Sequence, residues 1–163
     1  MPIAIGQSLP DATFVVMTED GPDKRTTGDV FAGRKVLLFA VPGAFTPKCH
    51  VNHLPGYVKQ RDAFREQGVD AIACTSANDI FVLTAWGRES GAEGIEFLAD
   101  GSAEFLRAIG LDVDMSGFGM GTRSKRYAMI VDDGTVTALE VEDAPGEVDR
   151  SSAEHMLDVL KAA

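Results

Sequence analysis

The stretch that decides the fold is VPGAFTPKC, residues 41–49, where the pattern of a strand ends and the pattern of a helix begins. Residues 35–41 (KVLLFAV) form a short apolar run bounded by glycine and proline, which is typical of a fully buried strand. Thr46 can cap a helix, and Pro47 suits the first helical position because its missing amide hydrogen would have no intrahelical partner there. The pattern therefore predicts that Cys49 lies in the first turn of a helix.

This placement predicts a reactive sulfur at Cys49. Free amide groups and the positive end of the helix dipole stabilise a thiolate relative to a thiol. A cysteine with the ordinary pKa of about 8.5 is only about 3% ionised at pH 7, whereas a pKa near 6 makes it roughly 90% ionised. Nucleophilic chemistry is therefore expected at this position.

Composition limits the class of protein. A chain of 163 residues is expected to form one domain, residues 1–163. The net charge of -10 argues against binding to nucleic acid or to an anionic membrane, because the field of the protein repels polyanions. No segment approaches the roughly 18 to 20 apolar residues of a membrane span, and the first residues lack the features of a signal peptide. With only 2 cysteines, the expected compartment is a reducing cytoplasm.

Strand and helix patterns alternate along the chain, which predicts an α/β domain with some parallel strand pairing. The first expected element is a peripheral hairpin of residues 11–18 and 26–30 around a turn at 19–23. After the strand at 35–41, helices are expected at 47–67, interrupted at Pro55-Gly56, at 79–88 and at 102–109, and strands are expected at 69–75 and 95–99. A loop at 115–121, a hairpin of 126–131 and 135–141, and a C-terminal helix opened by a capping box at 151–154 complete the chain.

The string PGAFTPKC, followed by His53 and Pro55-Gly56-Tyr57, closely resembles the active-site segment of type II peroxiredoxins, the subgroup typified by peroxiredoxin five. Similar features continue along essentially the whole chain, at residues 76–79, Trp86, residues 99–101, residues 123–127 and residues 151–154. The resemblance implies a thioredoxin-like fold, in which helices flank a central mixed β-sheet that carries an N-terminal β-hairpin. It also implies a thiol peroxidase that uses no cofactor.

The chemistry of peroxide reduction assigns roles to four residues. Cys49 is the expected nucleophile, and the hydroxyl of Thr46 is close enough in sequence to reach a bound peroxide. Pro42 is expected to wall the pocket from water. By the resemblance, Arg126 approaches the sulfur, where its permanent charge lowers the pKa of the thiol and binds the peroxide. Without the resemblance, the cluster around Arg126 is better interpreted as a solvated basic face.

The histidines near Cys49 suggest a metal site only weakly. Cys49 and His53 are four residues apart on the expected helix, and His50 or Cys74 could join them, but no second paired motif occurs. His53 occupies the position that supports the active-site helix in the resembling family. No metal site is therefore predicted.

Regeneration of the oxidised sulfur needs a second thiol. Cys74 is the other cysteine of the chain, and it lies in an apolar run that is typical of a buried core thiol. The favoured hypothesis is that glutathione or glutaredoxin resolves a sulfenic acid on Cys49. Thioredoxin with a transient Cys49–Cys74 disulfide is the other option, and that bond would require Cα atoms within about 7 Å.

Two classes of function are in competition. The favoured one is a thiol peroxidase for hydrogen peroxide and small organic hydroperoxides, which contributes to antioxidant defence and redox homeostasis. The alternative is a redox-sensing switch or a chaperone-like interaction protein that uses Cys49 with little turnover. By the resemblance, the chain is also expected to form homodimers through Phe45 and the segment at residues 79–86.

Overall fold

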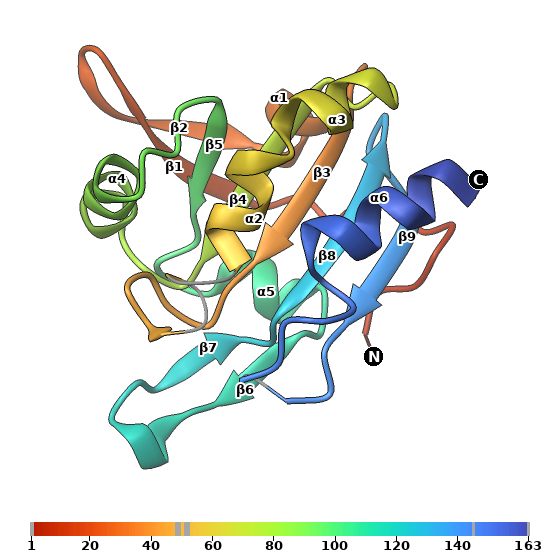
Figure 1. Cartoon of the computed structure of the whole chain (residues 1–163). Helices are drawn as coiled ribbons and strands as arrows, with labels where there is room; N and C mark the ends of the chain where they lie inside the picture. The colour runs from red at the N-terminus through yellow and green to blue at the C-terminus, as the bar shows by residue number, and fades with distance from the viewer. Residues whose placement is uncertain (1, 48–49, 51–52, 145, 163) are drawn as a thin grey trace.

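The computed structural model describes residues 2–47, 50, 53–144 and 146–162, whose elements are labelled in Figure 1. The strands are β1 (Thr13–Thr18), β2 (Gly21–Thr26), β3 (Lys35–Ala40), β4 (Ala71–Ser76), β5 (Ile95–Ala99), β6 (Asp112–Asp114), β7 (Thr122–Ser124), β8 (Tyr127–Asp132) and β9 (Thr135–Val141). The helices are α1 (Thr27–Phe31), α2 (Leu54–Lys59), α3 (Arg61–Glu66), α4 (Ile80–Glu89), α5 (Glu104–Ala108) and α6 (Ala153–Ala162), and a short 3₁₀ turn, η2, spans Ser116–Phe118.

Seven strands form one mixed sheet in the order β2-β1-β5-β4-β3-β8-β9. β3, β4 and β5 are parallel, whereas β8 pairs with β3 and β1 pairs with β5 in the antiparallel sense. β3 lies inside the sheet between β4 and β8, and its Phe39 lies opposite Cys74 on one side and Ala128 on the other. The predicted central mixed sheet with an N-terminal hairpin is therefore present, and the strand that ends at the site is buried between two neighbours.

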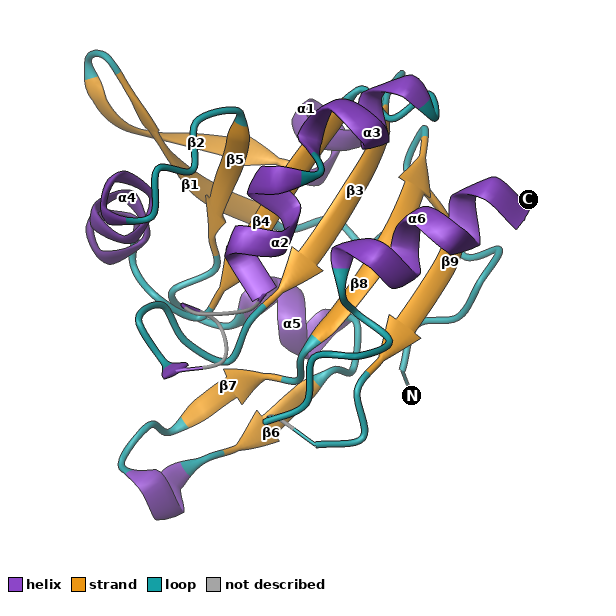
Figure 2. Cartoon of the chain, in the orientation of Figure 1, coloured by secondary structure: helices purple, strands orange, loops and turns teal. Residues whose placement is uncertain are grey.

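Helices cover both faces of this sheet, as Figures 1 and 2 show. Alternate side chains of a strand point to opposite faces, so Leu37 and Phe39 pack under α2, α3, α4 and α6, whereas Val36 and Leu38 pack on the side of α1 and α5. Burial of each such side chain contributes about 1.5–3 kcal/mol. The continuous apolar run of β3 is thus explained by burial on both faces.

The second strand of the N-terminal hairpin was predicted in the wrong place. β2 spans Gly21–Thr26, which includes residues expected to form the turn, and the segment expected as a strand forms helix α1. The reason is a reciprocal cap, in which the hydroxyl of Thr26 accepts from the amide of Asp29 and the Asp29 carboxylate accepts from the amide of Thr26. This capping box starts a helix where β-branched residues suggested a strand.

The helix after the site is divided at a different point from the one expected. Pro55 lies in the first turn of α2, where proline is tolerated, and the break falls at Gln60 between α2 and α3. The glycine-rich segment predicted as a loop carries the turn of a short antiparallel arm, β6 and β7, which projects at the bottom of Figure 2. The arm was missed because its strands are only three residues each.

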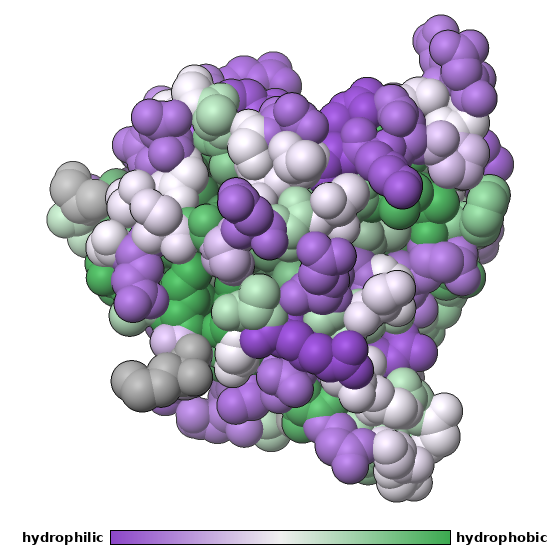
Figure 3. All heavy atoms as spheres, turned by 180° about the vertical axis from the view of Figure 1, so that it is seen from behind, coloured by the Kyte–Doolittle hydropathy of each residue, from purple (hydrophilic) through white to green (hydrophobic). Residues whose placement is uncertain are grey.

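The C-terminal helix begins with a different cap. The hydroxyl of Ser152 accepts from the amide of His155, whereas the hydroxyl of Ser151, the predicted cap, donates to Glu142. The face opposite that of Figure 1 is mainly hydrophilic, with hydrophobic surface in separate areas (Figure 3). Among the described residues, no helix has the length and hydrophobicity needed to cross a membrane.

Candidate active site

The loop that follows β3 is held by its own backbone and by the segment between β4 and α4. The hydroxyl of Thr46 donates to the carbonyl of Gly43 at 2.7 Å, and the amide of Ala44 donates to the side chain of Asn78 at 2.9 Å. Pro42 is buried, and Phe45 has a left-handed backbone with φ of 65°. The loop therefore has a defined shape before the helix begins.

Gly43 lies where the β6–β7 arm meets this loop. A Cβ atom at this position would lie 3.2 Å from both Met120 Cε and Thr46 Cγ2, so a larger residue would displace its neighbours. Arg123 of β7 donates from Nε to the Met120 carbonyl at 2.9 Å, and its Nη1 is 3.5 Å from the Pro42 carbonyl. The arm thus supports the loop from one side.

A helical turn starts at Thr46. The amide of His50 donates to the carbonyl of Thr46 at 2.9 Å, and Pro47 has helical backbone between them, as predicted. The indole of Trp86, fully buried on α4, donates to Nδ1 of His50 at 3.1 Å. This contact joins the turn to α4.

Arg126 is buried and points into the protein. It immediately precedes β8, only 2% of its surface is exposed, and its Nη1 lies 2.9 Å from Nδ1 of His53. A guanidinium has only donors, so Nδ1 of His53 must accept. Nε2 therefore carries the ring hydrogen and donates to the carbonyl of Ser151 at 3.0 Å. The structure therefore places Arg126 in the interior beside His53 rather than on a solvated face.

The environment of His53 keeps its ring neutral. Burial, followed by the positive charge of Arg126, lowers the pKa of His53 to about 3. The ring packs edge-on against Phe39 and tilted against Tyr57, with centroids 5.0 and 5.6 Å away. Both ring nitrogens bind protein groups, which fits a supporting role better than a metal ligand. Within the described part of the chain, no group of three or more potential ligand side chains is placed to hold a metal.

Cys49, the predicted nucleophile, lies outside the described residues, as does Lys48. Cys74 is fully buried on β4, within the core on the side of α2 and α4. Arg126 precedes the first residue of β8, and Pro42 follows the end of β3. Ala40 and Tyr127 lie opposite each other in the sheet, so Arg126 and Pro42 lie at the same end of it.

The sequence did not predict the hydrogen bonds that three residues make around the site. Asn78 accepts from the amide of Ala44 in the loop, and Tyr57 and Glu142 both bind Ser151. The burial of Tyr57 could have been predicted, because it lies three residues after Leu54 and so on the same apolar face of the helix. Glu142 gave no signal, because it stands close to Glu140 and next to Asp143 and is indistinguishable in the sequence from solvated carboxylates.

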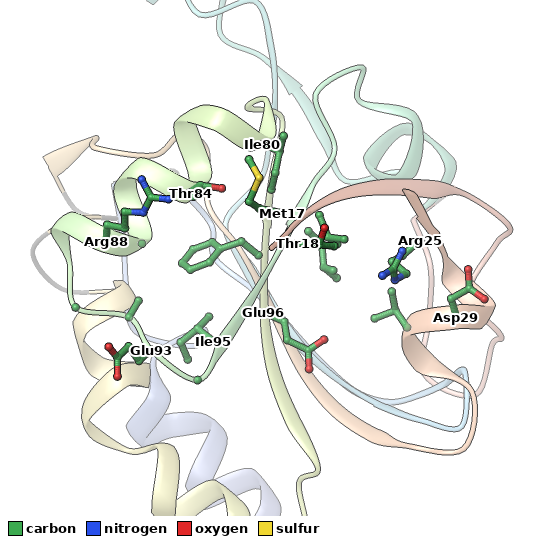
Figure 4. A pocket seen from close by; sticks show the side chains of 18 of the residues that line it. Met17, Thr18, Arg25, Asp29, Ile80, Thr84, Arg88, Glu93, Ile95 and Glu96 are labelled. Carbon is green, nitrogen blue, oxygen red and sulfur yellow. The ribbon is translucent and has the colours of Figure 1, made fainter. Parts of the chain in front are cut away.

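A separate hollow of about 920 Å³ lies between α4, β1 and β5 and is shown in Figure 4. Arg34 and Glu96 are among the residues that line it, and they form two hydrogen bonds with each other at 3.0 and 3.1 Å. Pro42, Thr46, Cys74 and Arg126, the predicted site residues that the structure describes, do not line this hollow. Cavity size therefore does not indicate the place of the chemistry in this protein.

Comparison with known proteins identifies the family of this chain. The family model described as Redoxin matches residues 4–157. The chain is 47% identical to the chloroplastic Peroxiredoxin-2E-2 of Oryza sativa subsp. japonica, over 97% of this chain and 72% of that protein. It resembles reduced Prx3 from Vibrio vulnificus, solved in complex with H₂O₂, with a TM-score of 0.93 and 52% identity over 97% of this chain and 99% of that one.

A third relative is peroxiredoxin 5 from Alvinella pompejana, with a TM-score of 0.88 and 35% identity over 99% of this chain and 100% of that one. These matches confirm the thioredoxin-like fold and the peroxidase class that the sequence predicted. Peroxiredoxins reduce peroxides at the expense of a thiol. The chain therefore belongs to the Redoxin family as a type II peroxiredoxin, which makes it a thiol-dependent peroxidase.

Proposed function

We propose that Cys49 is the residue that reduces hydrogen peroxide and small alkyl hydroperoxides. Its thiolate attacks one peroxide oxygen, the O–O bond breaks, and the other oxygen leaves as water or an alcohol after taking up a proton. Cys49 becomes a sulfenic acid. Thr46 and the nearby amides hold the peroxide, Pro42 excludes water, and Arg126 stabilises the charge that develops on the leaving oxygen.

The observation that supports this proposal most is the buried Arg126 held by His53. Burying a cation is unfavourable unless it is paired or hydrogen-bonded, and the hydrogen bond with His53 helps to meet this requirement. A guanidinium in this position is suited to stabilise a Cys49 thiolate and the negative charge that develops on the leaving oxygen of a peroxide. The ordered loop at residues 42–46 provides the remaining groups.

We propose that glutathione, alone or with glutaredoxin, closes the cycle. The thiol of glutathione condenses with the sulfenic acid and releases water, and a second thiol then reduces the mixed disulfide and restores Cys49. The complete burial of Cys74 supports this route, because a thiol in the core must leave its packing before it can form a disulfide.

Mass spectrometry of the protein after treatment with peroxide and glutathione tests this route. The expected product is a glutathione adduct on Cys49. An exclusive Cys49–Cys74 disulfide would overturn it and favour thioredoxin as the reductant. Steady-state peroxide consumption with each reductant separates turnover from the behaviour of a redox sensor, which would give one stoichiometric burst.

The proposed assembly is a homodimer that uses Phe45 and Phe81. These side chains are 47% and 65% exposed, and exposed aromatic groups of this size are common at interfaces. Trp86, in the same predicted segment, is fully buried and is not a surface contact. Sedimentation should show that Phe81→Asp shifts the protein toward monomer, whereas Phe118→Asp, on the β6–β7 arm, should leave the dimer intact. A dimer unaffected by Phe81→Asp would exclude this face.

The proposed compartment is the cytoplasm. A glutathione-dependent cycle needs a reducing environment, and a chain with only 2 cysteines does not depend on disulfides for its fold. Fractionation of the source cells tests the proposal, and recovery of the protein in an organelle or an oxidising compartment would contradict it.

A further inference from the structure

Glu142 makes an unusual set of hydrogen bonds just beyond the end of β9. It is only 6% exposed, and its carboxylate accepts from the amides of Asp149, Arg150 and Ser151 at 2.7, 3.1 and 2.9 Å. It also accepts from the hydroxyl of Ser151 at 2.6 Å. One side chain therefore fixes the backbone of residues 149–151.

The same short segment presents a carbonyl to the active site. The carbonyl of Ser151 accepts from the hydroxyl of Tyr57 at 2.5 Å and from Nε2 of His53 at 3.0 Å. The amide and hydroxyl of this residue are held by Glu142, so the position of its carbonyl follows from the position of the carboxylate. Glu142 is also tied to Arg126 through the backbone, since its amide donates to the Arg126 carbonyl at 3.0 Å.

The tautomer of His53 depends on this carbonyl. With an acceptor at Nε2, the ring carries its hydrogen there and leaves a lone pair on Nδ1 for the guanidinium of Arg126. In the other tautomer, an N–H at Nδ1 would face the N–H of Arg126, and two donors would oppose each other. The carbonyl of Ser151 thus selects the form of His53 that can hold Arg126.

We propose that Glu142 is a positioning residue for peroxide reduction: its carboxylate holds Ser151, the Ser151 carbonyl fixes the orientation and tautomer of His53, and His53 holds Arg126. The proposal rests on the proposed role of Arg126 in catalysis. It extends that role by connecting Glu142 to Arg126 through three successive hydrogen-bonded contacts: Glu142 with Ser151, Ser151 with His53, and His53 with Arg126.

The desolvation and hydrogen bonding of Glu142 agree with this role. Burial by itself raises the pKa of the Glu142 carboxyl, but the hydrogen bonds from Ser151, Asp149 and Arg150 outweigh it and leave the pKa below its ordinary value. The group is therefore a carboxylate at neutral pH and accepts all four hydrogen bonds. Its neighbour Glu140 offers a comparison, because it lies on the same chain segment but contacts His155 at 3.5 Å instead.

The test compares Glu142→Gln with the matched control Glu140→Gln in the full chain. Stopped-flow measurement gives the rate constant for the first peroxide turnover, and ¹⁵N NMR of the His53 ring gives its tautomer. Glu142→Gln should lower the rate constant by about 10- to 100-fold, since small misplacements of catalytic groups have effects of this size, and the single Nε2–H signature of His53 should be lost. Glu140→Gln should stay within about twofold of wild type, because it leaves the Ser151 segment in place.

A folded Glu142→Gln protein with an unchanged rate constant and an unchanged His53 spectrum would overturn the proposal. If that variant does not fold, Ser151→Ala tests the proposal instead. It removes the hydroxyl hydrogen bond to Glu142 and leaves the three hydrogen bonds from backbone amides. A measurable loss of rate with a shifted His53 resonance is then expected, and no change in either would overturn the proposal. A wild-type protein without peroxide turnover would instead contradict the proposed function itself.

Discussion

Nδ1 of His53 and Nη1 of Arg126 lie 2.9 Å apart, although the two residues are 73 positions apart in the chain. Both side chains are almost completely buried. The neutral imidazole supplies an acceptor for the buried guanidinium. Burial, followed by the charge of the guanidinium, keeps the imidazole from taking up a proton. This pair links the start of α2 to the start of β8.

Acid should destabilise the protein through His53. Its pKa is about 3 in the folded chain, whereas an unfolded histidine titrates near about 6.5. Between these values the unfolded chain binds a proton that the folded chain does not. The contribution of the neutral His53 to the free energy of unfolding is therefore fully present above about pH 6.5 and is lost as the pH falls toward about 3. In this range the free energy of unfolding decreases by about 1.4 kcal/mol per pH unit. In urea unfolding between pH 4 and pH 8, His53→Gln should flatten this dependence, whereas His155→Gln, whose side chain is partly exposed, should retain it. Equal slopes for wild type and His53→Gln would refute the assignment.

Arg126→Lys should lower the peroxide rate constant by about 100-fold, which is typical of the loss of one preorganised donor. Lysine keeps the charge but cannot bind His53 and the peroxide through a planar fork. The pKa of Cys49, measured by alkylation against pH, should also rise. Lys125→Gln, at the exposed neighbouring position, is the control and should leave both quantities near wild type. A fully active Arg126→Lys variant would remove Arg126 from the mechanism.

Gly43→Ala should disturb the loop that carries Thr46. The added methyl group would lie 3.2 Å from Met120 Cε and from Thr46 Cγ2, so one of them must move. Overpacking of this kind costs about 1–3 kcal/mol, and the peroxide rate constant should fall as Thr46 shifts. Gly117→Ala, on the β6–β7 arm with open space around it, is the matched control. Thermal unfolding and stopped-flow kinetics measure the two effects, and a Gly43→Ala protein identical to wild type in both would show that the contact is unimportant.

The fluorescence of Trp86 should report oxidation of the site. The chain has 1 tryptophan, and its indole donates to His50, the residue that follows Cys49. Addition of peroxide to the reduced protein should therefore change the emission. Cys49→Ser should abolish the change, and His50→Ala should reduce it while removing about 1 kcal/mol of stability with the hydrogen bond. An unchanged response in Cys49→Ser would mean that the signal arises elsewhere.

Much of this architecture could be predicted from local patterns. The apolar run of β3 identified a strand buried on both faces, and the Thr-Pro pair after it marked the start of a helical turn, because both signals depend only on neighbouring residues. The break between α2 and α3 could not be placed, since proline is tolerated in the first turn of a helix and the sequence does not fix where that turn begins. The β6–β7 arm was missed because short strands carry too few residues for a periodic signal.

The site was predictable only in part for a similar reason. Thr46 and Pro42 belong to the motif itself, whereas Arg126 was assigned through the family resemblance, because its own neighbourhood of Arg123 and Lys125 suggests a solvated surface. Glu142 and Ser151 act on the site through contacts that are distant in sequence. An acidic residue in a polar segment gives no indication that folding will bury it, so its role emerges only from the three-dimensional arrangement.

The most direct test of the account is the stopped-flow reduction of one equivalent of hydrogen peroxide by Cys49→Ser and by Cys74→Ser, with wild type as the reference. Cys49→Ser should lose the reaction completely, while Cys74→Ser should keep most of the rate of its first turnover. Rapid peroxide reduction by Cys49→Ser, or an equal loss in both variants, would contradict it.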